Sequence, residues 1–111
     1  MIFDKSLKAT WENAVLVIDK IGTPKNEFFI PTLLWLLQDV NWPGALHAIS
    51  ILAKYDKNVL IPQLEPKIRV AYEREDYMWL GGLKMLVEKC MYKKTDFSEE
   101  KTYMLLEFSD F

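Results

Sequence analysis

The chain nearly repeats itself, and this repeat constrains the fold more than any other feature. Ile30-Pro31-Thr32-Leu33 matches Ile61-Pro62-Gln63-Leu64 at an offset of 31 residues, and Gly44-Ala45-Leu46 matches Gly81-Gly82-Leu83 at an offset of 37. Each unit predicts a first helix with proline near its start, a turn, and a second helix that begins with small residues. One helix pair cannot bury its apolar face alone, whereas stacked pairs can. We expect the six extra residues of the later unit in the connection around residues 73–76.

Apolar residues at intervals of three and four predict the individual helices. The first helix is expected to begin near Asp4 or Ser6 and to end at a left-handed Gly22. A short last helix is expected after Ser98. Between them we expect four more helices. The first is capped by Asn26 and ends near residues 39–40, and the second follows Pro43 and buries Leu46, Ile49 and Leu52. The third is capped by Asn58 and has a kink or a delayed start at Pro66, and the fourth spans residues 76–92.

The sequence therefore predicts an all-α fold of about five to six helices in one domain, residues 1–111. Its architecture is expected to be HEAT-like: antiparallel helix pairs are stacked, and the first and last helices cap the stack. An irregular small helical bundle is the alternative. Gly81 and Gly82 lie inside an expected helix, where each glycine costs up to ~1 kcal/mol relative to alanine. We expect close helix packing to compensate for this cost.

Composition excludes several classes of partner and location. The net charge of −2 argues against nucleic-acid binding, which usually needs a basic patch. The most apolar stretch, residues 28–37, is too short to span a membrane, and the N-terminal residues do not have the pattern of a secretory signal. Cys90 is the only cysteine, so no intramolecular disulfide can form, which favours a cytoplasmic location.

No set of residues with catalytic spacing occurs. His47 is the only histidine and is expected at or near the surface, and Cys90 is expected to be a packing thiol on an inner helix face. One histidine and one cysteine cannot form a structural zinc site, and there is no phosphate-binding glycine loop. We therefore expect a protein that is not an enzyme and that has no catalytic residues, cofactor or metal.

The stretch Leu34-Trp35-Leu36-Leu37-Gln38-Asp39-Val40-Asn41-Trp42-Pro43 resembles the hallmark of a family of small HEAT-like helical proteins from bacteria, domain of unknown function 5071. In that family a leucine-rich helix runs into a Gln-Asp-x-Asn-Trp-Pro turn. The later Ile61-Pro62 also matches, so that the resemblance covers residues 28–90. It implies an all-α, HEAT-like fold and no activity. Small proteins of this kind often look like immunity or accessory proteins of bacterial toxin systems, so the resemblance suggests such a role by association alone.

Two groups of residues are candidates for a partner surface. The turn residues Asp39, Asn41 and Trp42 form the first group, in which Trp42 either fills a gap between helices or is an exposed anchor for a partner. The second group would line the concave face that the second helices of a stack present, and its members are polar: His47, Ser50, Lys54, Lys84 and Glu88.

The leading hypothesis is a non-enzymatic protein-binding module, an immunity or accessory protein of a bacterial toxin system. The alternative is a helical bundle that binds a small molecule or lipid, because the chain is rich in aromatic residues and methionine and the Gly81-Gly82 pair could line a pocket. An enzyme is a third possibility and would need a partner chain to complete its site. The identity of a partner and the oligomeric state stay open.

Overall fold

The computed structural model describes residue 8 and residues 10–109, and all regular structure within them is helical. The six α-helices of this part of the chain are α1 (Trp11–Ile21), α2 (Ile30–Leu36), α3 (Ala45–Leu52), α4 (Lys57–Glu73), α5 (Tyr77–Cys90) and α6 (Glu100–Met104). Short 3₁₀ helices join or extend them: η2 (Lys25–Phe29), η3 (Lys94–Asp96) and η4 (Leu105–Phe108). The predicted all-α fold of five to six helices is confirmed. None of the described helices is long and apolar enough to cross a membrane.

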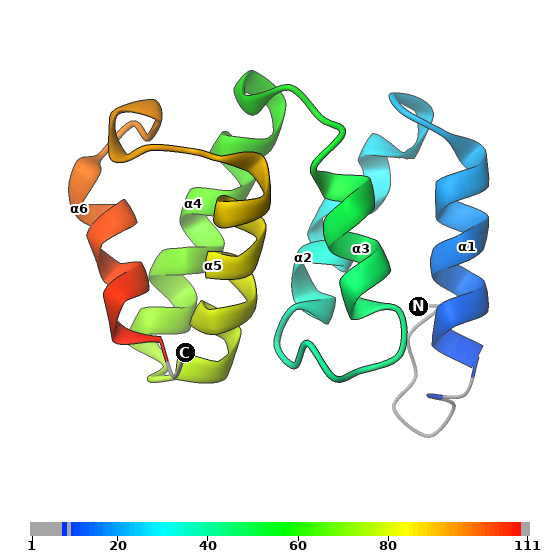
Figure 1. Ribbon diagram of the computed structural model, residues 1–111, viewed down its shortest axis with the longest axis horizontal. Helices are drawn as coiled ribbons and strands as arrows, with labels where there is room; N and C mark the ends of the chain where they lie inside the picture. Colours follow the sequence, from blue (N-terminus) through cyan, green and yellow to red (C-terminus); the bar gives the residue numbers. More distant parts are fainter. Residues whose placement is uncertain (1–7, 9, 110–111) are drawn as a thin grey trace.

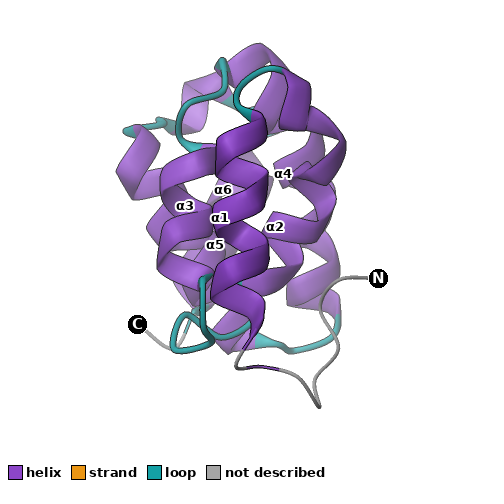
Figure 2. Ribbon diagram, turned by 90° about the vertical axis from the view of Figure 1, so that its right-hand side faces the viewer, coloured by secondary structure: helices purple, strands orange, loops and turns teal. Residues whose placement is uncertain are grey.

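The helices are stacked as antiparallel pairs along the longest axis of the molecule (Figure 1). Each of α2 and α4 packs against the helix that follows it, α2 contacts α4, and α3 contacts α5. One layer therefore contains α2 and α4, and the other contains α3 and α5, which run parallel to each other (Figure 1). The first and last helices, α1 and α6, lie at the two ends of the stack, and Figure 2 shows the molecule from the α1 end.

One continuous apolar core joins the helices. From α1 it receives Trp11, Val15 and Ile18, which are all at most 1% exposed. Leu37, directly after α2, is also buried. So are inner residues of α2 to α5, which include Leu33, Leu34, Leu36, Ile51, Leu52, Leu60, Leu64, Ile68, Leu80, Leu83 and Leu86. Burial of this apolar surface is the main favourable contribution to folding.

The expected close helix packing is present at Gly82, one of the two glycines of α5. A Cβ atom added at Gly82 would lie 2.0 Å from the carbonyl oxygen of Leu37 and 3.0 Å from the carbonyl carbon of Leu37. The backbone of α5 therefore approaches the residue that follows α2 more closely than any other residue type would allow. This contact joins the two helix pairs.

The fourth helix differs from the prediction at its start. Asp56, not Asn58, is the N-cap: its carboxylate accepts a hydrogen bond from the backbone N–H of Asn58 (2.9 Å). The helix then runs without interruption through Pro62 and Pro66, so the delayed start is wrong. Both prolines are exposed, and because they are four residues apart they share one helix face. The backbone carbonyl groups that lose a partner there can bind water instead.

The extra residues of the later unit lie in a helix rather than in the connection. The connection between α2 and α3 spans residues 37–44, whereas the one between α4 and α5 spans only residues 74–76. Pro31 lies in the first turn of α2, but α4 begins five residues before Pro62 and extends further beyond it. The predicted insertion around residues 73–76 is therefore wrong, because the second pair has longer helices and a tighter turn.

Two predicted caps have other roles. Asn26 lies inside η2 and is buried: its side-chain amide donates to the carbonyl oxygen of Ile18 (3.0 Å), and its side-chain oxygen accepts from the hydroxyl of Tyr55. Ser98 donates its backbone N–H (2.9 Å) and its hydroxyl (2.8 Å) to the buried carboxylate of Glu65, and α6 begins later, at Glu100. Both side chains connect distant elements instead of capping a helix.

The remaining differences concern helix ends. The expected caps Asp4 and Ser6 lie outside the described residues. Gly22 has the expected positive φ of 83°, but its ψ of 157° is extended rather than left-handed helical. The second helix ends at Leu36, earlier than predicted, because the chain turns toward α3 there.

Candidate functional site

A groove between α3 and α5 is the best candidate site. It consists of two adjoining hollows, both open to solvent, which share Met85 and Glu88. The upper hollow, of about 440 Å³, lies between α3 and α5, and the lower hollow, of about 350 Å³, lies between α5 and Val40 in the connection before α3. We call it the α3–α5 groove and define it by its lining residues: Val40, Leu46, Ile49, Ser50, Gly81, Lys84, Met85, Glu88 and Lys89. Its floor is apolar and its edges are polar or charged, as in many protein-binding surfaces.

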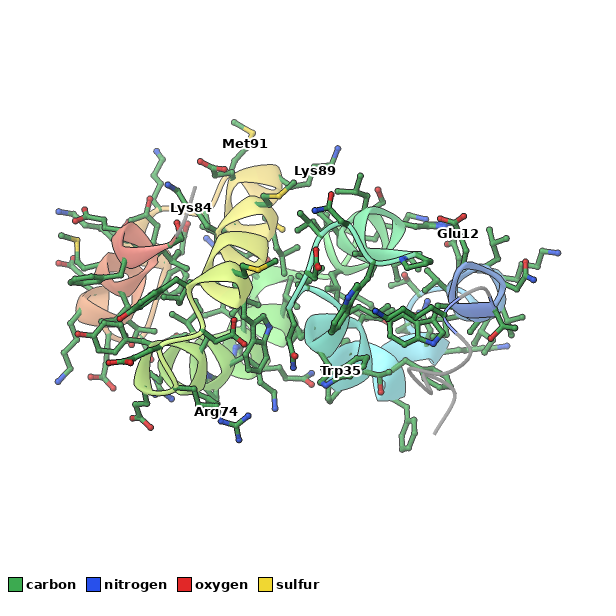
Figure 3. All side chains as sticks on the ribbon, turned by 90° about the horizontal axis from the view of Figure 1, so that it is seen from below. Glu12, Trp35, Arg74, Lys84, Lys89 and Met91 are labelled. Atoms are coloured by element: carbon green, nitrogen blue, oxygen red, sulfur yellow. The ribbon has the colours of Figure 1, made fainter. Side chains whose placement is uncertain are left out.

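The structure brings together three of the five residues predicted for a concave second-helix face. Ser50 lies in the upper hollow, Lys84 in the lower hollow, and Glu88 in both. Figure 3 shows how the lysines of α5 diverge: Lys89 extends toward α3, and Lys84 toward α6. Lys84 therefore stands at one edge of the groove and also borders a smaller hollow of about 140 Å³ beside η4.

The other two predicted residues, His47 and Lys54, lie outside this groove. Nε2 of His47 is 2.8 Å from one carboxylate oxygen of Asp19, and Nζ of Lys54 is 3.3 Å from the other. The two residues thus connect α3 and the chain after it to α1. The hydrogen bond with His47, followed by that with Lys54, lowers the pKa of Asp19 below its ordinary value of 3.8.

This pKa shift predicts a pH-dependent contribution to stability. A carboxylate whose pKa is lower in the folded than in the unfolded state stabilises the fold above the unfolded pKa, and this stabilisation is lost as the pH falls through the folded pKa. We expect Asp19→Asn to lower the free energy of unfolding at pH 6, with a difference from the wild type that shrinks below about pH 4. Urea unfolding of both proteins at several pH values measures this difference. A difference independent of pH would contradict the assignment.

The predicted turn site is mainly structural. Asp39 accepts a hydrogen bond from the backbone N–H of Asn41 (2.8 Å), as expected of a turn residue. Trp42 is half-buried, and its ring centre lies 5.4 Å from that of Trp11 and 5.3 Å from that of Trp35. Trp42 therefore plugs the space between α1 and α2. Between Asp39 and Asn41, Val40 reaches the lower end of the α3–α5 groove.

The described residues do not assemble a recognisable reaction centre. His47 and Asp19 have the spacing of a base and its orienting carboxylate, but no hydroxyl or thiol in the described part of the chain is hydrogen-bonded to His47. Burial raises the pKa of the half-buried Cys90 thiol, which makes it a weak nucleophile. Within residues 8 and 10–109, no group of three His, Cys, Asp or Glu side chains could hold a metal ion.

A hollow of about 490 Å³ lies between α4 and the segment around η3. Its charged groups already have partners within the chain. Lys57 lies 2.9 Å from Asp96, and Glu65 accepts both hydrogen bonds of Ser98. The pKa of Asp96 is lowered first by the backbone N–H of Lys93 and then by Lys57. These contacts hold η3 and the start of α6 against α4, so this hollow is a structural junction.

Sequence reasoning missed the apolar part of the groove. Leu46 was expected in the core, yet it is 60% exposed, and Met85 and Lys89 were not singled out. A helical wheel carries only part of the missing signal: at 100° per residue, Leu46 lies 40° from the exposed Ser50 and 60° from the buried Ile49, so it stands just past the edge of the buried face of α3.

Comparison of the chain with protein-family models, with curated proteins and with solved structures finds no significant match. The resemblance of the Gln38–Pro43 turn to a bacterial family therefore stays an expectation.

Proposed function

We propose that this chain is a non-enzymatic protein-binding module and that the α3–α5 groove receives its partner. The observation that carries the proposal is the exposure of Leu46 beside a groove with an apolar floor and polar edges. Leu46 adjoins Ile49 and Met85 in the same hollow, and exposed apolar surface that is contiguous in this way, rather than a single exposed leucine, marks protein-interaction sites. Ser50, Glu88 and Lys89 supply the hydrogen-bonding groups that would orient the partner.

The shape of the groove favours a protein over a small molecule. Ligand pockets of comparable volume usually enclose most of the ligand surface. Here both hollows are open and adjoin each other along α5, and the upper one also borders the parallel helix α3. An amphipathic segment of another protein could lie along them and insert side chains at intervals of three and four residues. Met85, with its flexible side chain, suits an adaptable contact of this kind.

The finer assignment is also a proposal. We infer that the two helix pairs are HEAT-like units, because each unit pairs two antiparallel helices and stacks on the next. Together with the resemblance of the Gln38–Pro43 turn, this supports a role as an immunity or accessory protein of a bacterial toxin system, acting in the cytoplasm. In that role the groove would bind the toxin or a component that accompanies it.

Leu46→Asp tests the groove directly. Leu46 is the second residue of α3, where an acidic side chain is favourable, so the variant is expected to fold. A charge in the lining of the groove should weaken partner binding by at least about tenfold, the effect of disrupting a binding hot spot. The measurement is quantitative affinity capture from a lysate of the source organism, with wild type and variant as parallel baits.

Phe28→Ser is the matched control. Phe28 is 86% exposed on η2 and does not line the groove, so this variant also removes a large exposed apolar side chain. A partner that the wild type and Phe28→Ser capture equally, and that Leu46→Asp loses, supports the proposal. A partner retained by Leu46→Asp, or no specific partner for the wild type, argues against it.

A further inference from the structure

The outer side of α1 combines exposed apolar residues with two opposite charges. The inner side of this helix is buried, but Leu16 and Val17 on the outer side are 42% and 58% exposed. Terminal helices of stacked helix pairs usually present a polar outer face, which keeps such proteins soluble. α1 lies at the end of the stack, and no other described element lies beyond it (Figures 1 and 2).

Glu12, Leu16 and Lys20 follow one another at intervals of four residues and therefore form a single stripe along α1. Glu12 and Lys20 are about 12 Å apart along the helix axis, at a rise of ~1.5 Å per residue. Both are exposed, and neither forms an ion pair with any residue in the described part of the chain. Figure 3 labels Glu12 on this terminal helix.

We propose that this stripe is a self-association surface on which a second copy of the chain packs α1 against α1 about a two-fold axis through Leu16. An antiparallel arrangement about that axis places Glu12 opposite Lys20 of the second copy, and Lys20 opposite Glu12 of the second copy. The stripe is thus its own complement, which a two-fold interface requires. A parallel arrangement would instead place like charges opposite each other.

The small size of this surface favours a weak contact. A contact between two helices of 11 residues buries less surface than the ~1,200–2,000 Å² that stable complexes bury. We therefore infer a weak, reversible dimer. The stripe does not include any residue of the α3–α5 groove, so the dimer leaves both grooves accessible and is independent of the proposed function.

Mixing two charge-reversed variants tests the proposal. In a dimer of Glu12→Lys, positions 12 and 20 of both copies are lysines, so like positive charges face each other. In a dimer of Lys20→Glu, the same positions are all glutamates, so like negative charges face each other. Each variant alone is expected to dimerise at least about tenfold more weakly than the wild type. In a one-to-one mixture every lysine of one chain faces a glutamate of the other, so dimerisation should return.

Sedimentation velocity from about 10 µM to about 1 mM measures the association. The wild type should approach twice its chain mass of 13.1 kDa at the highest concentrations. A folding defect in either variant cannot be repaired by mixing, so recovery in the mixture is specific to the interface. A wild type that stays monomeric throughout, single variants that associate like the wild type, or a mixture that stays monomeric would each overturn the proposal.

Cysteine cross-linking tests which face of α1 is in contact. Leu16 lies on the proposed axis and faces its own copy, so Leu16→Cys should give a disulfide-linked dimer under mild oxidation. Ile21→Cys is the matched control, because Ile21 is equally exposed (41%) but lies about 140° around the helix from Leu16. Cross-linking of Ile21→Cys as fast as Leu16→Cys would overturn the assignment of the contact to this stripe.

Discussion

Replacing Gly82 by alanine is expected to lower the free energy of unfolding by about 2–4 kcal/mol, a large effect for the addition of one methyl group. The new Cβ would lie 2.0 Å from the carbonyl oxygen of Leu37, and the atoms around it are also part of Leu37. A backbone carbonyl cannot rotate away as a side chain can, so α5 has to move away from the end of α2. The gain in helix propensity, up to ~1 kcal/mol, offsets only part of this cost.

Gly81→Ala is the matched control for this variant. Gly81 is the preceding residue of the same helix but lines the open lower hollow of the α3–α5 groove. Its replacement should be neutral or should stabilise the protein by up to ~1 kcal/mol. Urea unfolding followed by circular dichroism compares the two variants. Equal stability of Gly82→Ala and Gly81→Ala would show that the contact with Leu37 does not limit the packing.

Replacing Trp11 by alanine is expected to be at least as costly, at about 3–5 kcal/mol. Trp11 is 0% exposed, and its ring packs against two other indoles, with centres at 5.8 Å for Trp35 and 5.4 Å for Trp42. Truncation removes the only large core side chain at the start of α1 and leaves a cavity between α1, α2 and the turn before α3. In a domain of about 100 residues, this corresponds to a fall in Tm of roughly 15–30 °C.

Trp11→Phe separates cavity formation from a specific need for indole. Phenylalanine keeps most of the buried apolar surface, so its cost should be well below that of alanine. Thermal unfolding of the two variants, followed by circular dichroism, gives both values. If Trp11→Ala melted within a few degrees of the wild type, the three indoles would not form a cooperative part of the core.

Periodicity predicted the helices because apolar residues at intervals of three and four mark a buried face in almost any packing arrangement. The same pattern placed Ile49 and Leu52 in the core correctly. It failed for Leu46, which has the spacing of a core residue but lies just past the edge of the buried face of α3. A residue at such an edge is buried or exposed according to the neighbouring helix, which a local pattern does not contain.

Helix boundaries were harder to predict because one residue type can satisfy backbone groups in several ways. Asn26 and Ser98 have side chains suited to capping, yet their partners are 8 and 33 residues away, in Ile18 and Glu65. Asp56 caps α4, although Asn58 is an equally suitable residue type two positions later. Tertiary hydrogen bonds determine the roles of Asn26 and Ser98, and such bonds cannot be read from the local sequence.

The candidate site was predicted in part. The second-helix face was expected from the repeat, and it holds Ser50, Lys84 and Glu88 as predicted. His47 and Lys54 were assigned to the same face because the direction of each side chain was inferred from one helix alone. The position of Asp19 on α1, which both residues contact, depends on how α1 packs against α3.

The parallel course of α3 and α5 gives the groove an electrostatic direction. The positive ends of both helix macrodipoles, near Gly44 and Asp76, lie at the Val40 end, and both negative ends lie at the opposite end, near Ala53 and Met91. A helical segment that entered the groove antiparallel to them would align its own dipole favourably, by about 0.3–1 kcal/mol for each helix end. The groove therefore distinguishes the two directions of an inserted helix even where its side chains do not.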